Sequence, residues 1–322
     1  MIVVLTTRGH GYTLRRIGTK LFGAPAPRLH MRSYESYFTR RIVPRATYIF
    51  ADLERLAPWE LRLASELYRR LRDAGLRCLN DPAKVKGRYA LLRALHEAGI
   101  NPFTAYRAED APRPARFPVF LRYEQDHGKP LSGLIETQGE LEETLGSLPG
   151  RGIPLAGVIV VEYSSQEWID GLYHKWGTYK VADRMSLDHV AVDDNWLVKY
   201  GVWAKLTPAV IEEEYAACLD NRFNDDLRPA FEIAGIEFGR ADHSTVDGKT
   251  VVYEINTNPY MGRYVRDRIE LREKKQILKR TRLGEMLREI DSPPGAPVRL
   301  QDGELTPRKF YWGFGFLPRK RP

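Results

Sequence analysis

Apolar residues along the chain follow two kinds of pattern, and together these predict strands alternating with helices. Nearly continuous apolar runs, typical of buried strands, occupy 2–6, 46–52 and 157–162. After Pro58, a residue favoured in the first turn of a helix, apolar residues recur at helical spacing until Gly75. The patterns predict a further strand at 117–122 and further helices at 87–98, 137–148, 208–219, 221–234 and about 264–289. Residues 23–45 stay without an assignment. Such alternation predicts an α/β fold with a small open sheet in the first part of the chain.

The segment 235–259 predicts a β-hairpin. Two runs rich in β-branched residues meet at Asp247-Gly248, a strong turn signal. On the second predicted strand Glu254 and Asn256 are two positions apart. Side chains alternate along a strand, so both are expected on the same face.

The register of this hairpin decides whether Asp242 joins them. A two-residue loop would point Asp242 away from Glu254. A three-residue loop would place Asp242 opposite Glu254 and Arg240 opposite Asn256. In that register two carboxylates, an amide oxygen and a guanidinium share one face, and the oxygen ligands suit Mg²⁺. The alternative is a surface hairpin with a solvated polar face.

This hairpin resembles the metal-binding hairpin of the ATP-grasp superfamily, which includes D-alanine–D-alanine ligase, glutathione synthetase and glutamate-adding ligases. That hairpin has Arg-x-Asp on one strand and Glu-x-Asn on the next, often followed by Pro. The matching residues here are Arg240, Asp242, Glu254, Asn256 and Pro259. The resemblance covers about residues 1–290 and implies an α+β ATP-grasp fold.

The resemblance also implies a division of the chain. An open α/β domain is expected at 1–84, followed by a linker helix and lid subdomain at 85–165. A metal-bearing catalytic subdomain is expected at 166–295, with ATP held between it and the lid. Residues 296–322 form a basic tail with several aromatic residues.

Two positions that are lysine in the family are arginine here. Counting back from Gly99, Arg88 occupies or adjoins the place of the lysine that reaches the nucleotide phosphates, with Lys84 and Lys86 nearby. Arg122 occupies the place of the second phosphate-binding lysine. Arginine keeps the charge but changes the shape of the contact.

The remaining expected site residues follow from the same resemblance. Glu162 and Tyr163 are expected beside the adenine, with Glu167 and Asp170 as alternatives for the ribose. A phosphate contact is expected from Lys175, with Lys180 second, while Lys199 and Lys205 stay open. Arg240 is expected to stabilise the tetrahedral intermediate and Arg263 to bind a substrate carboxylate. His189 is expected to be an ordinary hydrogen-bonded histidine.

The composition indicates the charge expected of a binding partner but does not identify the partner. The 322 residues carry a net charge of +8, with 50 Lys and Arg against 42 Asp and Glu. This balance favours an anionic small-molecule or peptide substrate. Nucleic-acid binding rests on charge alone and is not favoured. With two cysteines and no apolar run of membrane-spanning length, the chain is expected to be cytoplasmic, and a homodimer is an expectation from the fold.

The implied activity is ligation of a carboxylate to an amine or thiol through an acyl phosphate, with release of ADP. The implied cofactors are ATP and Mg²⁺, with Mn²⁺ as an alternative metal. Two other hypotheses remain open. One is a nucleotide-binding module with little or no catalysis, and the other is an ATP-grasp kinase that phosphorylates an acceptor other than a carboxylate.

Overall fold

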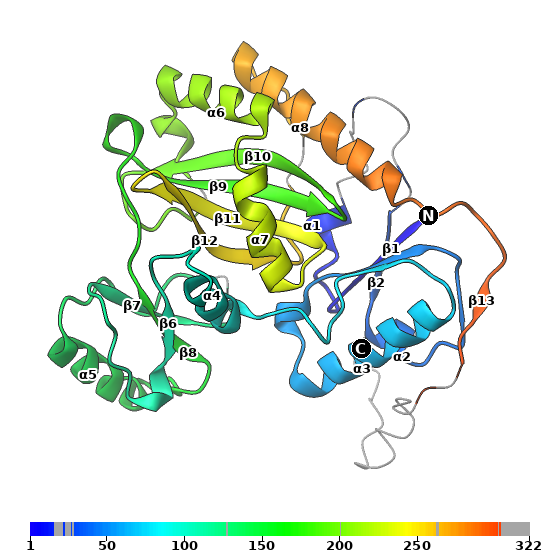
Figure 1. Ribbon diagram of the computed structural model, residues 1–322, viewed down its shortest axis with the longest axis horizontal. Helices are drawn as coiled ribbons and strands as arrows, with labels where there is room; N and C mark the ends of the chain where they lie inside the picture. The colour runs from blue at the N-terminus through cyan, green and yellow to red at the C-terminus, as the bar shows by residue number, and fades with distance from the viewer. Residues whose placement is uncertain are drawn as a thin grey trace.

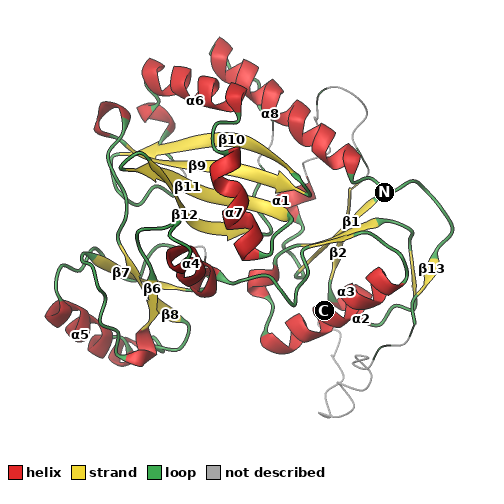
Figure 2. Cartoon of the chain, viewed as in Figure 1, coloured by secondary structure: helices red, strands yellow, loops and turns green. Residues whose placement is uncertain are grey.

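A computed structural model describes residues 1–15, 22, 27, 29–126, 128–199, 201–261, 264–301 and 303. Three larger sheets form the molecule. Figure 1 shows the sheet of β6–β8 and the sheet containing β1 at opposite ends, with α4 (Arg88–Glu97) between them. Above them lies the four-stranded sheet of β9–β12. Figure 2 shows that helices accompany each sheet.

The first sheet is parallel and buried on both faces. Its strand order is β2 (Leu29–Ser33), β1 (Ile2–Thr6), β4 (Thr47–Phe50), β5 (Cys78–Leu79). Alternate residues pack into two different cores. Val3 and Leu5 pack with α3 (Pro58–Asp73), while Ile2 and Val4 pack with the end of α8 (Glu270–Glu289). Burial on both faces explains the uninterrupted apolar runs in the sequence.

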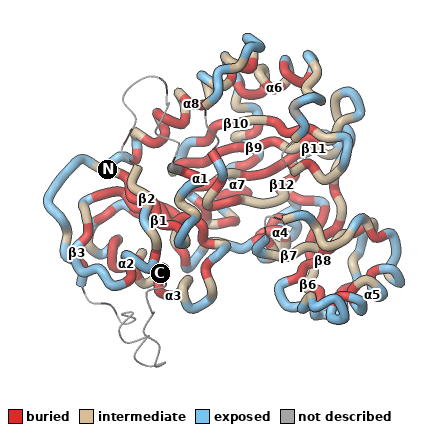
Figure 3. The backbone as a smooth tube through the Cα atoms, turned by 180° about the vertical axis from the view of Figure 1, so that it is seen from behind, coloured by how far each residue is buried: buried red, intermediate tan, exposed pale blue. Residues whose placement is uncertain are grey.

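The second sheet lies within 85–165, the segment expected to contain the lid. Its order is β6 (Ala105–Arg107), β8 (Val158–Glu162), β7 (Val119–Tyr123), and all pairs are antiparallel. Val158 and Val160 face α5 (Gln138–Ser147), which begins at the Thr137 cap. Ile159 and Val161 face the core that includes α4. Figure 3 shows these strands buried and the outer side of α5 exposed.

The third sheet is antiparallel, in the order β10 (Arg184–Asp193), β9 (Tyr173–Val181), β11 (Phe238–Val246), β12 (Lys249–Asn256). Trp176 on β9 packs in the core formed with α4, α6 (Pro208–Asp220) and α7 (Asn224–Ala234). Its neighbours Lys175 and Gly177 therefore point to the other face of the sheet. That face carries the candidate site.

The β11–β12 hairpin has a two-residue turn, and a β-bulge restores the pairing that a longer loop was expected to provide. Val246 pairs with Lys249. The register then shifts at Tyr253, so that Asp242 pairs with Glu254, and Arg240 with Asn256. Each of the two alternatives from the sequence was half right. The extra residue in a bulge changes the register without lengthening the turn.

Polar side chains join the first sheet to the third. Asn80 donates to the carbonyls of Phe50 and Phe238 at 2.9 and 2.8 Å. Its Oδ1 accepts from the backbone of Glu237 and Phe238, at 2.8 Å each. Thr257, just after the hairpin, accepts from Leu53 N at 3.0 Å. The hairpin is thus anchored from both of its ends.

Several elements differ from those expected. Residues 23–45 contain β2, α2 (Glu35–Phe38) and β3 (Ile42–Val43), and β3 pairs with β13 (Val298–Arg299). Helix α8 begins at Glu270 rather than near residue 264. A short helix not listed among the expected ones, α1 (Tyr12–Arg15), follows β1. In the part of the chain that the structure describes, none of the helices combines the length and apolar character needed to cross a bilayer.

Candidate active site

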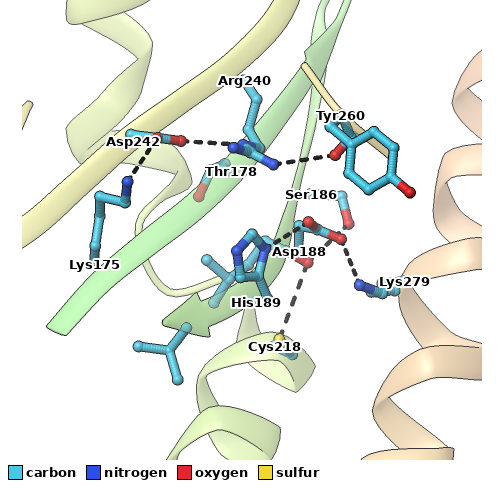
Figure 4. Close-up of polar contacts among 12 residues, drawn as sticks. Lys175, Thr178, Ser186, Asp188, His189, Cys218, Arg240, Asp242, Tyr260 and Lys279 are labelled. Atoms are coloured by element: carbon cyan, nitrogen blue, oxygen red, sulfur yellow. Dashed lines mark hydrogen bonds and ion pairs between the residues drawn. The ribbon is translucent and has the colours of Figure 1, made fainter. Parts of the chain in front are cut away.

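Three charged side chains form a continuous chain across β9 and β11. Lys175 Nζ lies 3.0 Å from Asp242 Oδ2, and Arg240 Nε lies 3.1 Å from Asp242 Oδ1. Arg240 also donates to the carbonyl of Tyr260 at 3.4 Å, as Figure 4 shows. Burial alone would raise the pKa of Asp242, but Lys175 and Arg240 hold it well below its usual range. Asp242 is therefore an ionised, nearly fully buried carboxylate.

Arg88 links α4 to both the lid and the hairpin. Its guanidinium forms an ion pair with Glu254 and donates to three backbone carbonyls at the end of β7, those of Tyr123, Glu124 and Asp126. Burial is the main cause, and nearby Arg122 the second, that lower the pKa of Arg88 to about 9. The predicted phosphate-side arginine thus lies directly against a predicted metal-ligand carboxylate.

The three expected metal ligands lie in neighbouring positions on β11 and β12. Asp242 is opposite Glu254 in the ladder, and Asn256 Nδ2 lies 3.3 Å from Glu254 Oε1. Two carboxylates and an amide provide the oxygen donors that Mg²⁺ and Mn²⁺ prefer, so the donor set fits. Among the described residues, His, Cys, Asp and Glu do not gather in threes that could hold a metal. The expected site therefore depends on Asn256 as its third donor.

An aromatic cavity adjoins this cluster between the lid and the third sheet. Its lining includes Arg88, Arg122, Lys175, Asp242 and Glu254, which are charged residues expected at the site. The aromatic part is built by Phe120, Tyr163 and Trp196, with ring centroids of Trp196 at 5.1 Å from Phe120 and 5.7 Å from Tyr163. Flat aromatic walls suit a purine base. Phe120 and Trp196 were not singled out from the sequence, because they come together only when β7 meets the loop after β10.

Glu162 lines the same cavity but is engaged within the lid. Its carboxylate accepts from Tyr106 Oη at 2.8 Å and from the backbone of Thr104 and Arg116 at 3.2 Å each. These bonds hold the edge of the lid sheet. A contact between Glu162 and a base stays a prediction.

The other expected residues are placed as follows. Arg122 donates to the carbonyl of Asp126 at 3.2 Å. Lys199 offers its carbonyl to Lys175 Nζ at 3.5 Å, and Lys205 pairs with Asp194. Lys180 lies on the opposite face, with Nζ 5.4 Å from the Phe231 ring centroid. Arg263 and the aromatic part of the tail lie outside the described residues.

The adjacent residues Asp188 and His189 on β10 lie next to the contact chain of Lys175, Asp242 and Arg240. His189 Nδ1 lies 2.6 Å from Asp188 Oδ2, and Asp188 also binds Lys279 of α8 at 2.7 Å (Figure 4). His189 pairs with Gly177 across the sheet, and a Cβ at Gly177 would come within 3.1 Å of both His189 and Arg240. The expected ordinary histidine therefore lies beside Arg240. Two adjacent titratable residues between apolar Leu187 and the apolar run 190–192 were the available sequence signal.

Neither a protein family model nor a curated protein sequence matches the chain. Solved structures with similar folds include the ATP-grasp ligase PsnB complexed with a minimal precursor, at TM-score 0.50 and 11% identity, covering 89% of this chain and 98% of that one. D-alanine–D-alanine ligase from Bacillus anthracis complexed with ATP has TM-score 0.46 and 12% identity, covering 90% and 96%. L-amino acid ligase from Bacillus licheniformis has TM-score 0.43 and 13% identity, covering 80% and 67%.

The likeness to PsnB extends over 89% of this chain and 98% of that one, so it includes most of the elements described above. A parallel sheet is followed by a small antiparallel lid and then by an antiparallel sheet that ends in the predicted hairpin. This chain therefore has an α+β fold of the ATP-grasp type.

Proposed function

We propose that the protein is an ATP-dependent ligase that joins a carboxylate to an amine through an acyl phosphate. The observation that carries the proposal is the contact chain Lys175–Asp242–Arg240 beside the aromatic cavity. The cavity suits the base, and the cationic side chains of Arg88, Arg122 and Lys175, which line the same cavity, are suited to bind phosphates. A fold shared with known ligases supports the proposal, but a fold alone does not establish an activity.

The residues divide the work in two stages. In the first, an oxygen of the donor carboxylate attacks the γ-phosphorus of ATP and ADP leaves, with Lys175, Arg88 and Arg122 stabilising the phosphate charge. In the second, the amine attacks the acyl carbon and phosphate leaves, with Arg240 stabilising the developing oxyanion. Asp242 holds Lys175 and Arg240 at fixed positions. Mg²⁺ held by Asp242, Glu254 and Asn256 would neutralise phosphate charge.

The test has a binding arm and a chemical arm. Mg-ATP should raise the melting temperature of the wild type by mass action, and Glu254→Ala should lose this shift. With a panel of carboxylates, ADP formation and trapping of an acyl hydroxamate by hydroxylamine should both depend on Asp242 and fall at least 100-fold in Asp242→Asn. Full ADP formation in Asp242→Asn would refute the proposed site.

The same experiment separates the alternatives. A Mg-ATP-dependent shift without ADP formation would support a nucleotide-binding module, an alternative favoured by the Arg88–Glu254 ion pair. ADP formation with a stable phosphorylated product, and without hydroxamate, would instead identify a kinase.

A further inference from the structure

The positive charge of the chain is concentrated near its two ends. Residues 1–50 contain nine Lys and Arg residues and a single acid, Glu35. Residues 305–322 contain five Lys and Arg residues and no acid. Together these two segments carry more positive charge than the net +8 of the whole chain, so the residues between them are net negative. The residues proposed for the active site all lie between the two segments, and the ligase proposal therefore does not use them.

The pairing of β3 with β13 brings the two basic segments together. Ile42 pairs with Arg299 across this two-stranded ribbon, and Leu300 N donates to the carbonyl of Arg41 at 2.8 Å. The basic tail continues the chain from β13. It therefore starts beside basic residues of the first segment, although the two segments lie at opposite ends of the sequence.

Five arginines on this part of the molecule are exposed, and we call them the basic face. They lie on β2, around β3 and on β13: Arg32, Arg40, Arg41, Arg45 and Arg299. Figure 3 shows that the chain around β3 is largely exposed. Burial raises the pKa of Tyr37, and Arg40 and Arg32 both act against this rise. The two guanidinium groups therefore lie near the same ring.

Most of this charge is not neutralised by acids of the described chain. Arg32 donates to the carbonyl of Met31 at 3.0 Å, and Arg40 donates to the carbonyl of Ser36 at 2.9 Å. Within the described residues, Arg32, Arg40 and Arg299 have no acid as an ion-pair partner. Exposed arginines that share one surface and lack acidic partners attract polyanions.

The basic face also carries an apolar side chain. Ile42 is 60% exposed, next to Arg41 in the chain and opposite Arg299 in the ribbon. The tail adds aromatic residues of the kinds found at membrane–water interfaces: Phe310, Tyr311, Trp312, Phe314 and Phe316. A phospholipid surface offers phosphates with an apolar layer beneath them, whereas a nucleic-acid duplex offers phosphates without such a layer. The mixture of arginines with apolar side chains therefore favours a lipid surface.

We propose that the basic face and the tail bind the surface of a membrane that contains anionic phospholipids. The arginines contact the phosphate groups of the lipids, and Ile42 and the aromatic residues of the tail enter the interface between headgroups and acyl chains. Stable attachment to a membrane surface requires two such contributions, because a single one gives only marginal binding. The proposal does not depend on the proposed ligase activity.

Cosedimentation of the full chain with vesicles tests the proposal. Vesicles of phosphatidylcholine alone are compared with vesicles in which one third of the lipid is phosphatidylglycerol. At low ionic strength the partition coefficient should be at least tenfold higher on the anionic vesicles, and it should fall as salt is added. Equal binding to the two kinds of vesicle, or binding to neither, would overturn the proposal.

Paired variants locate the binding surface. The double variant Arg40→Gln with Arg299→Gln should lower the partition coefficient on anionic vesicles at least fivefold. The matched control is Arg113→Gln with Arg151→Gln, which removes two exposed arginines from the 85–165 segment and should change the coefficient less than twofold. Equal losses in the two double variants would show that only the net charge matters, and would overturn the proposal.

The apolar contribution distinguishes a membrane from other polyanions. Ile42→Ser and Trp312→Ser should each lower the partition coefficient at least threefold without changing its dependence on salt. Unchanged binding in both variants would overturn the assignment to a membrane. Binding to duplex DNA without binding to anionic vesicles would assign the basic face to nucleic acid and would also overturn it.

ADP formation is measured on the same proteins, so that the two proposals are judged separately. The rate should be the same in the wild type and in both double variants, because none of the four arginines lies in the proposed active site. Vesicle binding without ADP formation would support the membrane proposal and reject the ligase. ADP formation without vesicle binding would do the reverse.

Discussion

At the scale of single residues, strand periodicity decides which lysine belongs to the site. Lys175 and Lys180 are five positions apart on β9 and therefore face opposite sides of the sheet. Lys175 binds Asp242, whereas Lys180 lies against Phe231 of α7. The sequence shows that the two differ in face. It does not show which face the helices cover, because that depends on packing between distant segments.

Replacing each lysine with methionine tests this assignment. Lys175→Met should lower kcat/KM for ATP at least tenfold, because a phosphate-side charge is lost and Asp242 loses one of its two cations. Lys180→Met keeps a similar stem and should retain activity within twofold. Steady-state ADP formation measures both, and equal losses would contradict the assignment.

Local motifs made part of the site predictable. Arg240, Asp242, Glu254 and Asn256 could be predicted because they lie on one hairpin, where sequence spacing sets the face. The contact of Arg88 with Glu254 could not be predicted, because the two residues are 166 positions apart and lie on a linker helix and a strand that meet only in the folded chain. The Asp188–His189 pair and Trp196 likewise depend on how β10 and its loop meet other elements. The assigned roles of all these residues stay predictions.

At the scale of elements, the bulge at Tyr253 explains how a tight turn and opposed carboxylates coexist. The turn signal at Asp247-Gly248 correctly indicated two residues. The motif correctly indicated that Asp242 and Glu254 are opposed. A bulge has a weak sequence signal, because almost any residue can be the extra one in the strand. The helices and strands with strong periodicity were predictable, whereas β2, β3 and β13 are too short and irregular.

The folding stability of the protein is expected to depend on pH through a histidine buried between strands β9 and β11. His174 Nε2 lies 3.0 Å from Ser244 Oγ, and burial lowers the pKa of His174 to about 4. The unfolded chain binds this proton near pH 6.5, so stability falls as the pH decreases from 6.5 towards 4. At pH 5 the loss from this residue is about 2 kcal/mol relative to pH 7.5.

Urea unfolding at pH 7.5 and pH 5 measures this effect. The decrease in unfolding free energy should be about 2 kcal/mol smaller in His174→Gln than in the wild type. The comparison uses the difference between two pH values, so a uniform loss of stability in the variant does not affect it. An identical decrease in both proteins would show that His174 titrates normally in the folded state.

At the scale of the whole molecule, a few buried polar residues fix the first sheet against the third. Asn80 adopts a φ of 65° and makes four hydrogen bonds through its side chain. The alternating pattern predicted the small open sheet in the first part of the chain, and the resemblance to the ATP-grasp superfamily implied the α+β class and the later subdomains. The junction between the first and third sheets could not be predicted, because in the sequence Asn80 resembles an ordinary turn residue before Asp81-Pro82. The boundaries expected near 84, 165 and 295 stay predictions.

Asn80→Ala should lower the unfolding free energy by at least about 3 kcal/mol, because several buried backbone groups lose their partners. Asp170→Ala is the matched control, since Asp170 has a φ of 57° but is exposed. That variant should lose only about 1 kcal/mol, from backbone strain. Denaturant unfolding compares them, and equal losses would show that strain rather than hydrogen bonding dominates at Asn80.

If metal and nucleotide bind as proposed, the Arg88–Glu254 ion pair gives their binding the character of an ion-exchange reaction. Glu254 already has a positive partner, so a divalent cation at this carboxylate would have to replace one charge with another. A nucleotide would offer the displaced guanidinium a new counter-ion in its phosphates. The affinity for each ligand then depends on the presence of the other, and thermodynamic reciprocity requires that the two effects be equal.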